Sequence, residues 1–146
     1  MVDVLEEVTS GTITKEHVVK RIDDWVDRLN RLYALVERWL PPGWKVVQHR
    51  VVQMNEEMMQ TYKVAPRELP VLDLENGSGR AAYLEPRGLW IVGTNGRVDL
   101  YAGEKHYLIL DRSEAFAKPD WSISDFNKRS KHEKLDRGSF RAALAE

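Results

Sequence analysis

The sequence contains no cysteine, and this absence excludes disulfide bonds, thiolate catalysis and cysteine-based metal sites. It also contains no run of about eighteen apolar residues, the length that a membrane-spanning helix needs. Neither sign of charge is in excess, because 22 basic residues stand against 23 acidic ones and the net charge is −1. A chain so balanced has no general electrostatic attraction to nucleic acid or to a membrane surface. We therefore expect neither as a partner.

Signatures of catalysis and of metal binding are absent as well. The four histidines lie far apart along the chain, and none has the spacing of an H-E-x-x-H motif. No G-x-S-x-G sequence occurs, which excludes the serine-hydrolase elbow. The glycine-containing stretch at residues 77–79 lacks the spacing and the lysine of a phosphate-binding loop. We predict no metal and no cofactor, and these absences favour a non-catalytic protein.

The length of 146 residues suits one domain with a sizeable core. We assign residues 1–146 to a single α+β domain, with residues 1–13 as a loose N-terminal arm. This arm carries acidic residues and lacks the basic-then-apolar pattern of a signal peptide, so we expect the protein in the cytoplasm. Five tryptophans are the unusual feature of the composition, because tryptophan concentrates in cores and at interfaces.

Residues 15–40 are predicted to form one amphipathic helix, the most informative pattern in the chain. Thr14 suits the N-cap position, and proline at residues 41 and 42 ends the helix. On the solvent face we expect ion pairs between residues four apart, among them Asp24–Arg28. Apolar residues at alternating spacings of four and three form a continuous stripe: Val18, Ile22, Trp25, Leu29, Leu32, Val36 and Trp39.

This stripe has two interpretations. It packs on a sheet of the same chain, or it forms a coiled-coil seam with a second copy or a partner helix. At about 1.5 Å per residue the helix is longer than a typical strand, which spans about 17–20 Å. An overhanging helix end is a natural contact, and Trp25 and Trp39 are our candidates for an interface. We accordingly expect a protein partner or self-association.

After residue 43 the period of the apolar residues changes from 3.6 to 2, which predicts an antiparallel, mostly meander sheet of about five strands. We expect the long helix to pack across this sheet. Asn55 is placed to cap a short helix over residues 55–63. We also expect short C-terminal helices, the last of them over residues 140–145 and beginning at Ser139. The predicted strands are residues 44–54, 69–74, 80–85, 88–102 (as a hairpin) and 105–111.

The hairpin prediction depends on Asn95 and Gly96. This pair between two alternating runs is the strongest short signal of a two-residue turn, because both positions then adopt positive φ. Opposed residue numbers would sum to 191, which pairs Trp90 with Tyr101. A second two-residue turn at residues 103–104 would make the numbers sum to 207, which pairs Tyr101 with His106. One face of the sheet is then apolar and receives the long helix, and the other is mixed.

The mixed face is the candidate site for a ligand or a partner, and it carries Trp90, Arg97, Asp99, Tyr101 and His106. Two aromatic rings beside an arginine, a carboxylate and an imidazole suit a peptide, a base or a small anion. The alternative is structural. Arg97 and Asp99 then form an ordinary pair on a solvated sheet face, and the Trp–Tyr pair stabilises the sheet.

The leading hypothesis is a non-catalytic, cytoplasmic protein-interaction module, such as an accessory subunit, an immunity-type inhibitor or an antitoxin-like binder. One alternative is a small enzyme or binding domain for a phosphorylated or nucleotide-like ligand. Arg97 would then bind the anion, Asp99 or His106 would be the acid or base, and Trp90 or Tyr101 would stack on the ligand.

A second alternative is a nucleic-acid-processing accessory subunit that uses residues 128–137. This stretch holds five basic and two acidic residues, a local charge of +3. It has no interleaved aromatic residue for base stacking.

Overall fold

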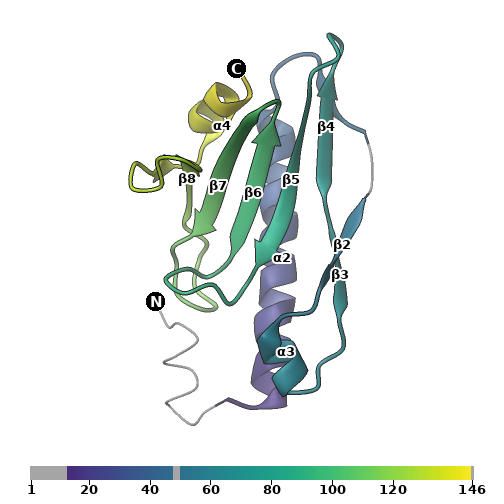
Figure 1. The fold of residues 1–146 in the computed structure, drawn as a ribbon, viewed down its shortest axis with the longest axis vertical. Coiled ribbons are helices and arrows are strands. Elements are labelled where there is room, and N and C mark those ends of the chain that lie inside the picture. The colour runs from purple at the N-terminus through teal and green to yellow at the C-terminus, as the bar shows by residue number, and fades with distance from the viewer. Residues whose placement is uncertain (1–12, 48–49, 146) are drawn as a thin grey trace.

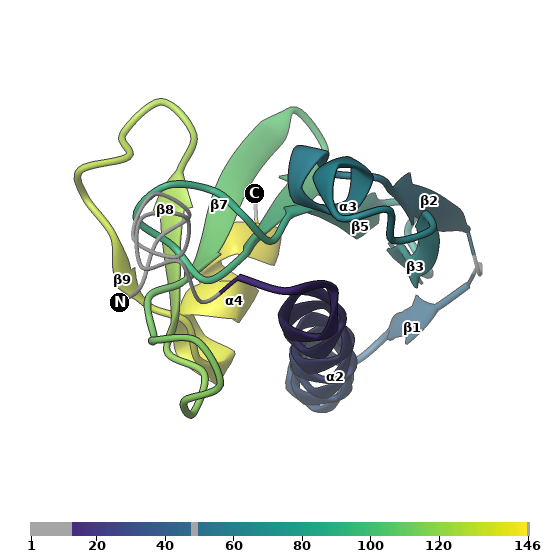
Figure 2. The same ribbon diagram turned by 90° about the horizontal axis from the view of Figure 1, so that it is seen from below.

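The computed structural model describes residues 13–47 and 50–145, so all of the predicted N-terminal arm except Ile13 lies outside the described residues. It confirms an α+β protein with a long N-terminal helix and a large antiparallel sheet. Figure 1 shows this helix behind the sheet. Figure 2 shows it on the same side of the sheet as the short C-terminal helix. No helix in the described residues is long and apolar enough to cross a membrane.

Helix α2 (Lys15–Trp39) forms as the sequence predicts. The Thr14 hydroxyl accepts a hydrogen bond from the backbone N–H of His17 at 3.1 Å, which satisfies one of the unpaired donors of the first turn. The helix ends immediately before Leu40 and the two prolines. Its apolar stripe is buried against the main sheet, so the first interpretation of the stripe is correct for most of its length.

The main sheet has seven strands in the described residues rather than five, all antiparallel, in the order β1-β4-β5-β6-β7-β8-β9. A separate two-stranded sheet pairs β2 with β3. The strands are β1 (Trp44–Val46), β2 (Val51–Met54), β3 (Arg67–Pro70), β4 (Leu72–Asn76), β5 (Ala81–Gly88), β6 (Arg97–Ala102), β7 (Lys105–Asp111), β8 (Trp121–Asp125) and β9 (Glu133–Lys134).

The predicted hairpin over residues 88–102 is wrong. Strand β5 continues through Pro86, with a bulge between Pro86 and Gly88, and pairs with β6. Residues 89–96 form a connection instead of a strand, and at its end the Asn95 N–H bonds to the carbonyl of Asp111 at 2.8 Å, which extends the pairing of β6 with β7. Tyr101 therefore lies opposite Tyr83 and not opposite Trp90.

The second predicted turn is correct. Strands β6 and β7 pair so that opposed residue numbers sum to 207, with Tyr101 opposite His106 and Ala102 opposite Lys105. Strand β7 has the predicted bounds. Two adjacent strands and their register therefore follow from a two-residue turn alone.

The predicted strand over residues 44–54 is broken into β1 and β2. Against β4 the opposed numbers sum to 120, as in Trp44 with Asn76, and against β3 they sum to 121, as in Val51 with Pro70. Val47 N–H still bonds to the Asp73 carbonyl. The register of residues 44–54 against residues 67–76 therefore shifts by one residue between the main sheet and the small sheet. The predicted strand over residues 69–74 is broken at Val71 in the same way.

Two short helices complete the chain. Helix α3 (Glu57–Thr61) lies within the predicted range, but its N-cap is Glu56 rather than Asn55, and no side chain caps it. Helix α4 (Arg137–Leu144) begins two residues before the expected Ser139. Asp136 caps it, and the Ser139 side chain completes a reciprocal capping box.

Candidate binding face of the sheet

The two faces of the main sheet differ in character. Alternate residues of β6, such as Val98 and Leu100, are fully buried beneath α2. The residues between them, Arg97, Asp99 and Tyr101, lie on the opposite face, which we call the outer face. The pairing of β6 with β7 adds His106 to this face. Four of the five residues predicted for the site are therefore brought together.

Asp99 is the centre of this group and is only 1% exposed. Its carboxylate accepts hydrogen bonds from Arg97 Nε at 2.7 Å and Nη2 at 2.9 Å. His106 Nε2 lies 2.7 Å from Oδ2, and the Tyr101 hydroxyl lies 3.5 Å from the same oxygen. The hydrogen bonds to Asp99 raise the pKa of the Arg97 guanidinium, and burial together with the Asp99 charge raises the pKa of Tyr101. Arg97 and Asp99 thus form a fixed, bidentate pair.

Aromatic rings stack in a row across the outer face. Ring centroids are 4.7 Å apart for Tyr83–Tyr101, 4.3 Å for Tyr101–His106 and 4.3 Å for His106–Phe126. The interplanar angles are 23°, 15° and 15°. The four rings come from β5, β6, β7 and the segment after β8. We call these rings, with the arginine at each end, the stacked row: Arg50, Tyr83, Tyr101, His106, Phe126 and Arg129.

The two arginines close the ends of the stacked row. The guanidinium of Arg50 lies 4.9 Å from the Tyr83 ring centroid, and that of Arg129 lies 4.3 Å from the Phe126 ring centroid. Each ring face is therefore covered by a neighbouring ring or by a guanidinium group. The row leaves ring edges and arginine side chains for contact with another molecule.

Carboxylates on the outer face are more buried than the arginines that pair with them. Arg50 binds Asp73 with two nitrogens at 2.6–3.1 Å, and its side chain is 50% exposed against 12% for Asp73. This hydrogen bonding raises the pKa of Arg50. Asp99 is likewise more buried than Arg97. Positive groups are consequently nearer to the surface than the negative groups that balance them.

Tyr83, Phe126 and Arg50 are not among the residues predicted for the site. Tyr83 is opposite Tyr101 only because β5 pairs with β6, and the predicted hairpin assigned that place to Trp90. Phe126 follows β8, a strand that is not among the predicted ones, and its backbone N–H bonds to the carbonyl of His106. The alternation of Trp121 and Ile123 with serines was the available signal for β8.

The remaining candidates lie elsewhere. Trp90 is in the connection after β5, with the Arg21 guanidinium 5.8 Å from its ring centroid. Trp25 is 0% exposed and packs against Trp121, so it is a core residue rather than an exposed contact. Trp39 is half-buried against Phe140 of α4, with ring centroids 6.3 Å apart.

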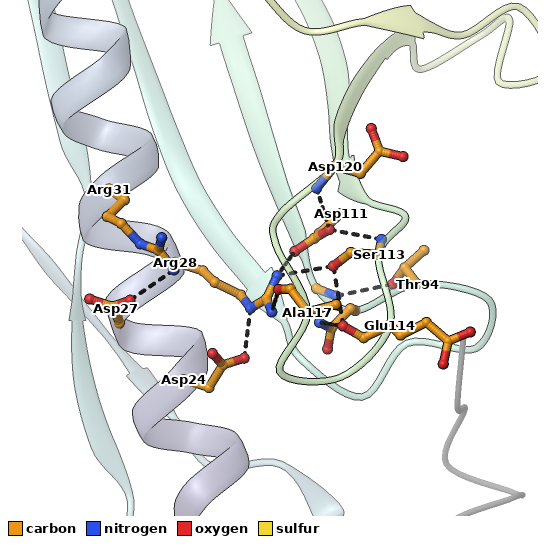
Figure 3. A network of polar contacts seen from close by, with 12 residues as sticks. Asp24, Asp27, Arg28, Arg31, Thr94, Asp111, Ser113, Glu114, Ala117 and Asp120 are labelled. Carbon is orange, nitrogen blue, oxygen red and sulfur yellow. Dashed lines mark hydrogen bonds and ion pairs between the residues drawn. The ribbon is translucent and has the colours of Figure 1, made fainter.

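A second polar network joins α2 to the end of β7 on the inner face (Figure 3). Arg28, expected on the solvent face, is fully buried, and its Nη1 lies 2.7 Å from Asp111 Oδ2. It also binds Asp24, Ser113 Oγ and the carbonyl of Ala117. The other Asp111 oxygen accepts the backbone N–H groups of Ser113 and Asp120. This network fixes the β7–β8 connection to the helix.

The comparisons with known proteins give no assignment: no family model, no curated protein and no solved structure matches this chain. Within the described residues, no group of three or more His, Asp and Glu side chains is arranged to hold a metal ion. The outer face is thus the site to interpret, and its interpretation depends on its own geometry.

Proposed function

We propose that this chain is a non-catalytic protein-interaction module that binds a cytoplasmic protein partner through the outer face of its main sheet. The observation that carries the proposal is the stacked row, a continuous series of four rings with an exposed arginine at one end and a second arginine at the other. Tyrosine and arginine are enriched among the residues that dominate binding energy at protein interfaces.

Preorganisation supports a binding role. Binding normally costs free energy because side chains lose freedom when they enter an interface. In the stacked row each ring is held by its neighbours, and Arg97 is held by two hydrogen bonds to Asp99. Little further ordering is needed when a partner arrives, so the contact energy contributes more fully to affinity.

The same geometry weighs against the nucleotide-like alternative. A base that stacks on a protein needs an open ring face. The faces of Tyr101 and His106 are covered by Tyr83, by each other and by Phe126. The guanidinium of Arg97 is engaged by both oxygens of Asp99, which reduces its value as an anion clamp. We therefore favour a partner that contacts ring edges over a ligand that inserts between rings.

The experiment is affinity capture from cells that express the natural partner, with the wild-type chain and two charge variants as bait. Arg87→Glu with Arg129→Glu changes the outer face without removing a partner from Asp99 or Asp73. Arg31→Glu with Arg38→Glu makes the same change of charge on the exposed side of α2. Circular dichroism and thermal melting establish that all three baits are folded.

We expect one protein to be captured by the wild type and by the α2 variant, and to be lost from the outer-face variant. Cross-linking followed by mass spectrometry should then place that protein against β5, β6 and the segment after β8. Equal capture by all three folded baits, or equal loss from both variants, would contradict the proposed surface.

A further inference from the structure

A groove separate from the outer face lies between α3 and the connection after β5. It has a volume of about 520 Å³, within the size range of small-molecule sites. Its lining is made by α3, the residue on either side of it and two residues of the connection: Glu56, Glu57, Met58, Thr61, Tyr62, Trp90 and Val92. Val92, 77% exposed, is a large apolar side chain at the surface beside this opening.

The groove is held together by the Glu56 carboxylate. Its oxygens accept the backbone N–H of Leu89 at 3.0 and 3.1 Å and the N–H of Trp90 at 3.1 Å. Because these bonds join the start of α3 to the connection, the Trp90 backbone is fixed relative to the helix. The groove is therefore largely formed before any ligand arrives, which lowers the cost of binding.

The walls combine aromatic rings and a thioether with negative charge. Trp90 and Tyr62 supply the rings, and tryptophan is the aromatic side chain that attracts cations most strongly. Trp90 already has one cation near its ring, the Arg21 guanidinium at 5.8 Å. No lysine, arginine or histidine is among the residues that line the groove.

The two carboxylates have different roles. Burial raises the pKa of Glu56, its bonds to the two backbone N–H groups act in the opposite direction, and Arg21 provides a nearby positive charge. Glu57 is exposed in the first turn of α3 and has no ion-pair partner in the part of the chain that the structure describes. Its charge is thus available to a molecule in the groove.

We propose that this groove binds a small organic ammonium ion, with Trp90 and Tyr62 against its alkyl groups and Glu57 balancing its charge. Aromatic walls, a carboxylate with no ion-pair partner among the described residues and a lining without cationic side chains match this chemistry and oppose an anion. The site is independent of the outer face, so either proposal can fail without the other.

The test uses two probes of the same shape. Choline carries a quaternary ammonium group, and 3,3-dimethyl-1-butanol replaces its nitrogen with carbon and has no charge. Both are titrated into the full-length protein labelled with nitrogen-15, and backbone amide shifts report where each binds. We expect saturable shifts with choline, confined to α3 and residues 89–92, and about tenfold weaker binding of the alcohol.

Three variants make the assignment specific. Glu57→Gln removes the charge and should weaken choline binding severalfold, while binding of the alcohol stays the same. Trp90→Leu and Tyr62→Leu should each weaken choline binding. If both do, a local distortion caused by one of the substitutions does not explain the loss. The matched control is Glu68→Gln on β3, an exposed glutamate outside the groove, which should bind choline like the wild type.

Equal affinity for the two probes would overturn the proposal, since the groove would then be a simple apolar site. No saturable choline binding by the folded protein would overturn it as well. Shifts located on the outer face instead of α3 would assign the cation to another site, with the same consequence.

Discussion

Arg28 and Asp111 form a fully buried ion pair, with Arg28 Nη1 2.7 Å from Asp111 Oδ2 and both side chains 0% exposed. The two residues are 83 positions apart, on α2 and at the end of β7. A buried pair of charges stays favourable only while both partners and their hydrogen bonds are present. The contact therefore makes the packing of the β7–β8 connection dependent on one helix residue.

Arg28→Met should destabilise the protein by about 3–5 kcal/mol, because it leaves the Asp111 carboxylate buried without its cation. The matched control is Arg31→Met, one turn along the helix, where Arg31 pairs with Asp27 in an exposed ion pair of 2.9 Å. That change should alter stability by less than about 1 kcal/mol. Urea denaturation monitored by tryptophan fluorescence measures both. Similar changes in the free energy of unfolding would show that the buried Arg28 pair contributes no more to stability than the exposed Arg31 pair.

Gly96→Ala should be among the most damaging small substitutions in the chain. Gly96 has φ +125°, and a Cβ placed there would lie 2.2 Å from Cζ3 of the buried Trp25. Strain and displacement of the indole together should cost about 3 kcal/mol or more. Gly77→Ala is the control, because no atom lies within 4 Å of its added Cβ and its φ is not positive. Thermal melting should separate the two clearly, and an unchanged midpoint for Gly96→Ala would contradict the close packing at Trp25.

Asp99→Asn should lower the free energy of unfolding by about 2–3 kcal/mol, because the amide replaces charge-assisted hydrogen bonds to Arg97 and His106. Asp27→Asn removes the carboxylate of an exposed pair and should cost less than about 1 kcal/mol. Chemical denaturation provides the comparison. If Asp99→Asn keeps full stability, the carboxylate is not needed to hold the outer face together, and its burial would need another explanation.

Asp136 at the N-cap of α4 predicts a specific pH dependence. Hydrogen bonding to the Ser139 backbone N–H lowers the pKa of Asp136 below its ordinary value of 3.8. The unfolded state therefore binds its proton first as the pH falls. Its contribution to stability is complete above about pH 4 and is lost as the pH falls through the lower, folded-state pKa.

Asp136→Ala should accordingly be less stable than the wild type at neutral pH, with a difference that narrows below about pH 4. Melting temperatures of both proteins across an acidic series test this. A difference that stays constant to low pH would mean that the side chain acts through something other than its charge.

Local signals predicted the elements that depend on neighbouring residues alone. Thr14 and the prolines after Leu40 define α2 because capping and the missing proline N–H act within one turn. The register of β6 on β7 likewise follows from the turn at residues 103–104. In these cases tertiary contacts agree with the local preference.

Predictions failed where distant residues override that preference. Asn95 and Gly96 have the composition of a hairpin turn, yet the Asn95 side chain accepts a hydrogen bond from Arg21 and donates one to the Glu114 carbonyl. Arg28 has the spacing of a surface ion pair with Asp24, and only the position of Asp111 buries it. Neither long-range partner can be located from sequence periodicity.

For the candidate site, the sequence placed Arg97, Asp99, Tyr101 and His106 together because β6 and β7 are adjacent in the chain. The stacked row required Tyr83 and Phe126, which reach it through pairings that the misplaced hairpin concealed. Trp90 was lost from the site for the same reason. A single wrong turn thus changed the interpretation of the outer face without changing the fold class.

The one-residue shift between β1 and β2 separates two sheets that we expect to differ in local stability. The small β2–β3 sheet has two strands, whereas the main sheet has seven within the described residues, and backbone hydrogen bonds of Val47 and Val71 lie where the two sheets meet. Such a ribbon can open while the large sheet stays closed. Amide hydrogens of β2 and β3 should exchange with solvent earlier than those of β5, β6 and β7. The β2–β3 sheet would then be the first part of this protein to unfold locally.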